Sequence, residues 1–355
     1  MNRLFTTGIV VGGALLAALS VQAEWYLTNN ALDDTNPVTA GKLVAWQLDD
    51  TNDTEVMFYN GKTTVQLTDN AFDEYGLFMA KKYLVWVSDL DGTGNLNEIM
   101  LWNGKVIVQV SNGGGLLDMS NPHTDGKYVV WEQDDGVSVE IMLWDGKTIT
   151  NISSNGYDNF APRVDKGRVV WYANDGGGDD EIFLWDDGVV TQLTDNTGDD
   201  QDPVIEGKLI AWIGDDTVNG DTDVFLFDGT ATVQLSTATG NVGNLSISKK
   251  CVAWAEDDGV DDEIFLWQKE IVTQVTDNAV DDNGVVNYGN KMVWLYDDPN
   301  GNNNQIMYRN SKGLLTQLTN TKSNSNLQFN GKSVVWQRTE VDREIYIFPG
   351  KTKLP

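Results

Sequence analysis

The side chains that can do chemistry in this sequence are mostly paired aspartates. The pairs stand shortly after recurring tryptophans, at Asp49, Asp50, Asp134, Asp135, Asp175, Asp215, Asp216, Asp257, Asp258, Asp297 and Asp298. Loop carboxylates bind divalent cations and attract cationic partners, so we predict that these residues form a ligand-binding surface. The competing interpretation is that aspartate is present because it suits tight turns.

One loop has the spacing of a calcium site. Asp89 and Asp91 occupy positions one and three of an EF-hand-like loop, Gly94 occupies position six, and Asn95 is a further oxygen donor. Thr93 and Met100 depart from that pattern, so the match is incomplete. We predict Asp89, Asp91 and Asn95 as metal ligands and Ca²⁺ as the candidate cofactor.

Catalytic residues are sparse. His123 is the only histidine, and Arg163 holds the equivalent position one repeat later. His123 is interpreted either as a structural residue or, with Arg163, as an acid–base or anion site beside a channel. The sequence shows no glycine-rich phosphate loop and no nucleophile elbow, and Cys251 stands in an apolar run. The residues therefore favour a protein that is not an enzyme.

These residues sit in a repeat of about forty residues. Its register is set by tryptophans at positions 46, 86, 131, 171, 212, 254, 294 and 336. Each tryptophan closes one apolar run, and an alternating segment such as 181–185 (EIFLW) follows it. A turn such as Asn103-Gly104 then leads to a further strand, because Asn-Gly and Asp-Gly favour two-residue hairpins. With a short segment before each tryptophan run, every repeat supplies four antiparallel strands.

Eight such units predict an all-β fold, an eight-bladed β-propeller of four-stranded antiparallel blades. The tryptophans are expected to pack between blades. Residues from Trp25 to Ala31 match the end of a repeat, so we predict that the N-terminal segment closes the ring by adding the outer strand of the eighth blade. Alternation of turns along a blade places the loops after the tryptophans and the loops between blades at one end.

The repeat resembles the TolB-like propellers of secreted and periplasmic bacterial proteins. The resemblance rests on the tryptophan, the Asp-rich loop, the Glu-Ile-Phe-Leu segment, Asp-Gly and Thr-Gln-Leu-Thr-Asp-Asn, and it covers residues 24–355. It implies a propeller used as an interaction platform, as a domain beside a peptidase or as a polysaccharide-lyase scaffold. The six-bladed namesake differs in blade number, so its partners are not carried over.

Composition narrows the partners further. Residues 1–23 contain a basic start, an apolar run and a small-x-small cleavage motif, which predicts a signal peptide followed by one propeller domain at 24–355 and export to the periplasm or the extracellular space. The net charge of −29 disfavours nucleic acid, and membrane insertion is not expected. We therefore predict a monomeric, non-catalytic protein that binds a protein or glycan through the acidic loops, with Ca²⁺ as a possible aid. The alternative is a Ca²⁺-assisted polysaccharide lyase or hydrolase with a site at the central channel.

Overall fold

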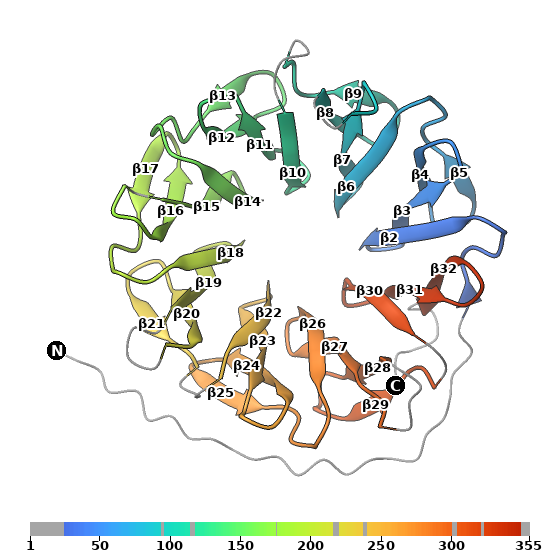
Figure 1. Ribbon diagram of the computed structural model, residues 1–355. Helices are drawn as coiled ribbons and strands as arrows, with labels where there is room; N and C mark the ends of the chain where they lie inside the picture. Colours follow the sequence, from blue (N-terminus) through green and yellow to red (C-terminus); the bar gives the residue numbers. More distant parts are fainter. Residues whose placement is uncertain are drawn as a thin grey trace.

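A computed structural model describes residues 25–93, 96–113, 118–174, 176–215, 220–236, 240–299, 304–320 and 323–348. The predicted signal peptide at 1–23 lies outside these ranges. The described residues form strands and connecting loops, and they contain no helix that is long and apolar enough to cross a membrane. The strands gather into eight sheets arranged as a ring (Figure 1).

The first four blades follow the chain in order. They contain β2 (Asp33–Ala40), β3 (Leu43–Asp49), β4 (Thr54–Tyr59) and β5 (Thr64–Gln66) in blade 1; β6 (Asp73–Ala80), β7 (Tyr83–Asp89), β8 (Asn97–Trp102) and β9 (Ile107–Gln109) in blade 2; β10 (Asp118–Thr124), β11 (Val129–Asp134), β12 (Val139–Trp144) and β13 (Ile149–Asn151) in blade 3; and β14 (Asn159–Asp165), β15 (Arg168–Asn174), β16 (Asp180–Asp186) and β17 (Val189–Gln192) in blade 4.

The second half repeats the same plan. It contains β18 (Asp200–Glu206), β19 (Leu209–Asp215), β20 (Thr222–Phe227) and β21 (Thr232–Gln234) in blade 5; β22 (Val242–Ser248), β23 (Cys251–Asp257), β24 (Asp262–Gln268) and β25 (Ile271–Gln274) in blade 6; β26 (Asp282–Tyr288), β27 (Lys291–Tyr296), β28 (Gln305–Arg309) and β29 (Leu315–Gln317) in blade 7; and β30 (Asn324–Phe329), β31 (Val334–Thr339), β32 (Arg343–Phe348) and β1 (Trp25–Tyr26) in blade 8. The predicted eight four-stranded antiparallel blades are confirmed.

Ring closure joins the two ends of the described chain. β1 pairs antiparallel with β32, with Trp25 opposite Ile347 and Tyr26 opposite Tyr346. Beyond β1, the Leu27 amide donates to the Ile345 carbonyl at 2.8 Å. The prediction that the N-terminal segment supplies the outer strand of blade 8 is confirmed, and this segment covers the outer edge of β32 at Ile345, Tyr346 and Ile347.

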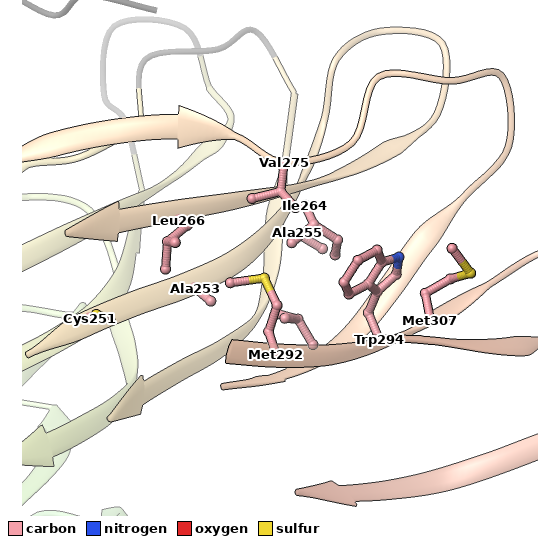
Figure 2. Close-up of a cluster of buried hydrophobic side chains, with 10 residues drawn as sticks. Cys251, Ala253, Ala255, Ile264, Leu266, Val275, Met292, Trp294 and Met307 are labelled. Carbon is pink, nitrogen blue, oxygen red and sulfur yellow. The ribbon is translucent and has the colours of Figure 1, made fainter. Parts of the chain in front are cut away.

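The core lies between the blades. All eight repeat tryptophans are fully buried, as the sequence predicted. Figure 2 shows one junction, in which Trp294 and Met292 of blade 7 pack against Ala253, Ala255 and Ile264 of blade 6. Cys251 is buried at the same junction, and burial raises the pKa of its thiol, which fits a packing role. Radial packing of this kind fixes the innermost strands around the centre of the ring.

Candidate functional site

The innermost strand of every blade carries a bulge. The register between the first and second strands shifts by one residue in each sheet, for example between Thr35 and Val38. The first bulged residue adopts a left-handed backbone in all eight blades, at Asn36, Gly76, Asn121, Ala161, Asp202, Asn244, Gly284 and Asn326. Asparagine, aspartate and glycine tolerate this conformation better than other residues do. These bulges lie on the innermost strands, which surround the centre of the ring (Figure 1), and four of the eight positions are asparagine.

Polar side chains connect these bulges across blade boundaries. Glu132, which follows Trp131, accepts hydrogen bonds from Asn121 Nδ2 of its own blade at 2.8 Å and from the Ala161 amide of the next blade at 2.7 Å. Gln337 of blade 8 likewise accepts from Asn326 Nδ2 at 3.0 Å and from the Asn36 amide of blade 1 at 3.3 Å. These bonds hold the channel wall in one register from blade to blade.

His123 lies on the innermost strand of blade 3 as a half-buried, neutral side chain. Its Nδ1 accepts a hydrogen bond from the Val164 amide at 3.2 Å, and its ring lies against Phe78 with centroids 3.9 Å apart. Burial, and then the charge of Arg163, hold its pKa well below the ordinary value. In a catalytic triad Nδ1 donates to a carboxylate. Here Nδ1 is an acceptor, so this histidine does not have the arrangement of a triad base.

Arg163 stands one blade further on, as the repeat predicted. Its Nη1 donates to the Pro162 carbonyl at 3.0 Å. Burial lowers the pKa of the guanidinium, while the charges of Asp202 and Glu132 act in the opposite direction. The structure thus brings His123 and Arg163 together in the wall formed by blades 3 to 5, next to two acidic residues.

The predicted ligand-binding aspartates build their own loops. Asp50 Oδ1 accepts from the Asn52 and Asp53 amides, and Asp135 Oδ1 from the Val137 and Ser138 amides. These backbone hydrogen bonds hold the pKa of both carboxyls below the ordinary range. Asp49, Asp134, Asp257 and Asp258 cap their turns in the same way. This geometry accounts for their positions without a ligand.

The other predicted ligand-binding aspartates lie in three loops of blades 4, 5 and 7, and only some of them are among the described residues. The amides of Asp215 and Asp297 donate to the carbonyls of Asp199 and Asp281, each at 2.9 Å, so the loops after the tryptophans do adjoin the loops between blades. Asp175 and Asp216 lie outside the described residues, and Asp298 adjoins Asp297 in its loop.

The predicted EF-hand-like loop is only partly described. Asp89 is the buried last residue of β7, and Asp91 accepts from the Thr93 amide at 2.9 Å and from Thr93 Oγ1 at 2.7 Å. Asn95 lies outside the described residues. Calcium binding by Asp89, Asp91 and Asn95 is still a prediction.

Sequence reasoning missed a set of buried polar residues, seven of which are acids. The residue that opens the Glu-Ile-Phe-Leu segment is buried in every blade, at Glu55, Glu98, Glu140, Glu181, Asp223, Glu263, Gln305 and Glu344. A Ser or Thr after the fourth strand pairs with it and also accepts the next backbone amide, as Thr276 Oγ1 does from the Ile264 amide at 2.8 Å. The repeated Leu-Thr and Val-Thr pairs after the fourth strand were the available signal.

A second set of buried acids accepts hydrogen bonds from the repeat tryptophans. Asp34, Asp200 and Asp282 accept the indole Nε1 hydrogen of the tryptophan twelve residues later, at 2.5, 2.8 and 2.7 Å. Desolvation raises the pKa of Asp34 to about 6 and those of Glu74 and Asp282 to about 7. These carboxyls are structural parts of the blade junctions.

The fold was compared with known proteins. No family model matches the sequence, and no curated protein matches it. Among solved structures, the propeller domain of the Trilobed protease from Pyrococcus furiosus is similar with a TM-score of 0.57 and 12% identity, over 81% of this chain and 98% of that one. A Mycobacterium tuberculosis puromycin-hydrolysing peptidase gives 0.57 and 12%, over 87% and 58%, and a prolyl endopeptidase gives 0.61 and 11%, over 91% and 55%.

These comparisons correct the predicted function. The chain spans a little over half the length of the whole peptidases, and about all of the isolated propeller domain. The expected non-catalytic protein or glycan binder is contradicted, and so is the alternative of a polysaccharide lyase or hydrolase, because the similar propellers belong to peptidases. TolB from Acinetobacter baumannii is similar with a TM-score of only 0.43 and 16% identity, over 64% of this chain and 61% of that one. At these identities the comparisons show the fold alone, and the chain is an eight-bladed β-propeller.

Proposed function

We propose that this chain is a peptidase-related propeller whose central channel handles extended peptides for a peptidase active site. The observation that carries this proposal is the likeness to the propellers of the Trilobed protease, the puromycin-hydrolysing peptidase and the prolyl endopeptidase. The resemblance of the repeat to secreted and periplasmic propellers, together with the composition of residues 1–23, supports a place outside the cytoplasm.

The chemistry of the channel supports handling of peptides. The exposed residues of the bulge ring include Asn36, Asn121, Asn244 and Asn326, whose amides have the same donor and acceptor pair as a peptide group. An extended peptide exposes one such pair per residue, so it can exchange hydrogen bonds with successive blades. Asp202 and the half-buried Arg163 add one negative and one positive charge to the residues of the innermost strands.

Peptide-bond cleavage is assigned to a catalytic unit other than the described residues. The one histidine of the chain holds Nδ1 as an acceptor and stays neutral against Phe78, so it lacks the arrangement of a triad base. Peptidase action in this proposal therefore needs a catalytic centre that works beside the propeller.

Binding of labelled linear peptides to the full chain, followed by fluorescence anisotropy, tests the proposal. The variant Asn36→Gly/Asn121→Gly/Asn244→Gly removes three amides but keeps the left-handed backbone, because Gly76 and Gly284 already hold that position. If each amide contributes about 0.5–1.5 kcal/mol, the dissociation constant rises at least about tenfold. Asn103→Asp is the matched control, since Asp145 makes the same turn bonds as Asn103 does in the outer hairpin.

Two results would contradict the proposal. One is equal peptide affinity in the triple variant and the unaltered chain. The other is binding of a folded protein or a glycan at the channel while linear peptides fail to bind.

A further inference from the structure

Three blades have an additional aspartate beside the buried glutamate that begins their third strand. An Asp stands two residues before the buried Glu of the third strand in Asp53/Glu55, Asp179/Glu181 and Asp261/Glu263. The fourth strand of the same three blades is followed by a further aspartate, at Asp69, Asp195 and Asp277. The other five repeats lack this combination. Asp-x-Glu and the exit aspartate therefore occur together in blades 1, 4 and 6.

The carboxylates in these blades are buried without enough donors. Glu263 is 0% exposed and Asp261 is 8% exposed. Glu263 accepts from the Asn278 amide at 2.5 Å and pairs with the Thr276 hydroxyl, whereas both carboxylate oxygens of Asp261 have no hydrogen-bond partner among the described residues. A buried carboxylate oxygen without a donor or a counter-charge is costly.

Blades 1 and 4 repeat this arrangement. Glu55 and Glu181 are each 0% exposed, and they pair with the Thr68 and Thr194 hydroxyls as Glu263 does with that of Thr276. One oxygen of Asp53 and one of Asp179 are buried and unpartnered in the same sense. The charge of Asp53 acts on Glu55 and that of Asp179 acts on Glu181, so the members of each pair lie close together.

Blade 3 shows what this position needs. Ser138 replaces the aspartate there, and its hydroxyl donates to Glu140 Oε1 at 3.0 Å. The other oxygen of Glu140 accepts from Ser153 Oγ and from the Ser154 amide. A serine thus satisfies the glutamate with a proton. An ionised aspartate has no proton to donate, so blades 1, 4 and 6 present two carboxylates where blade 3 presents a donor and an acceptor.

We propose that Asp53/Glu55, Asp179/Glu181 and Asp261/Glu263 are divalent-cation sites, each completed by the exit aspartate of its blade, and that the cation is Ca²⁺. Calcium takes six to eight oxygen ligands in flexible geometry, including backbone carbonyls and water. The described residues hold no group of three His, Cys, Asp or Glu side chains already at metal-binding geometry. The strand pair is therefore the preformed part of each site, and an exposed side chain such as Asp277 rotates to close it.

The surrounding charge favours a cation. The pKa of Asp261 is raised by burial and by the neighbouring charges of Asp258 and Asp281, among other aspartates. The same burial and the charge of Asp261 raise the pKa of Glu263. The sites lie at the loop end of the ring rather than on the innermost strands, so they are separate from the proposed peptide channel.

Calorimetric titration of the full, EDTA-stripped chain with CaCl₂ at pH 8 tests this inference. We expect about three ions per chain, with dissociation constants of about 10⁻⁴–10⁻³ M as in extracellular calcium modules, and a rise in melting temperature. Asp261→Ser places a serine where blade 3 has Ser138, and we expect it to lower the number of bound ions by one. Asp53→Ser/Asp179→Ser/Asp261→Ser abolishes binding.

The matched control is Asp342→Ser. Asp342 also stands two residues before a buried glutamate, but Glu344 accepts from Thr28 Oγ1 and, at 2.8 Å, from the Asn30 amide. We expect this variant to bind as many ions as the unaltered chain. If the serine variants fold poorly, Asp277→Asn gives the same readout, because Asp277 is exposed. No heat and an unmoved melting temperature up to about 10 mM Ca²⁺ would overturn the proposal, and so would unchanged binding in the triple variant.

Discussion

Replacement of Asp34 by asparagine tests whether the buried acids of the blade junctions destabilise the protein at alkaline pH. Asp34 is 1% exposed where blade 8 meets blade 1. Its two oxygens accept from Trp46 Nε1 at 2.5 Å and from Asn30 Nδ2 at 2.6 Å. Desolvation raises its pKa from 3.8 to about 6. Because the folded pKa exceeds the unfolded one, its stabilising contribution is complete below about pH 4 and is lost as the pH rises through about 6.

The size of the effect follows from the shift. A rise of about two pKa units corresponds to at most about 3 kcal/mol of unfolding free energy between pH 4 and pH 8. With an unfolding entropy of about 2.1 cal/mol/K per residue, a chain of this length loses about 3–4 °C in melting temperature over that range from this one carboxyl.

The asparagine variant keeps the hydrogen bonds and removes the titration. Blade 4 already has Asn159 at this position, where its Oδ1 accepts from Trp171 Nε1 at 2.9 Å and its side chain pairs with Asn155 at 3.0 Å. Asp34→Asn should therefore melt higher than the unaltered chain at pH 8, and its melting temperature should depend less on pH.

Differential scanning calorimetry in EDTA between pH 4 and pH 8 measures this difference. Acidification also relieves the overall negative charge, so the comparison is between variants at each pH. Asp187→Asn is the control, because it removes one exposed charge at a turn where the left-handed backbone suits asparagine. If Asp34→Asn and the unaltered chain lose the same number of degrees towards pH 8, the reasoning from desolvation is refuted.

Three further variants test the ring and its channel wall. Thr28→Val removes the hydroxyl that accepts the Ile345 amide at 2.8 Å, so we expect a loss of about 1–3 kcal/mol and faster hydrogen exchange in β32 but not in β16. His123→Val places in blade 3 the residue that blades 1 and 5 already have, and we expect a stability change within about 1.5 kcal/mol and no altered pH dependence near about pH 6.5, because burial keeps this histidine neutral. Gly214→Ala brings a Cβ against the Asp200 carboxylate and to 2.9 Å from the Phe225 ring, and denaturant unfolding should show a loss of about 1–3 kcal/mol.

The repeat made most of the fold predictable. Eight tryptophans with regular spacing fixed the blade count, because each one must be buried between two sheets that cannot bury it alone. Asn-Gly and Asp-Gly turns fixed the order of strands within a blade. The match of residues 25–31 to a strand end predicted the closing strand, since pairing with β32 required the same Thr-Asn pattern found elsewhere.

The site was less predictable, for a physical reason. A carboxylate in a turn and a carboxylate in a binding surface look alike in sequence, and Asp50 and Asp135 proved to hold their own turns through backbone amides. Conversely, Glu263 follows Asp261 and Asp262, a pattern typical of the start of an exposed strand, yet it is fully buried. Its burial depends on a donor from Thr276, which becomes a neighbour only after the fourth strand folds back.

Differences among the copies carry information that the shared pattern does not. Blade 6 has Val242 where most blades place an acceptor for the tryptophan, and there Glu256 accepts the Trp254 indole hydrogen at 2.7 Å instead. In this blade a different residue is the acceptor, and the requirement that the buried Trp254 N–H be satisfied is met. The Asp-x-Glu pairs of blades 1, 4 and 6 do not meet this requirement, because each places an aspartate oxygen without a donor beside a buried glutamate. A change that leaves a buried group short of a partner in three blades, always together with a third aspartate, is best explained by a positive ion that takes the place of the missing donor.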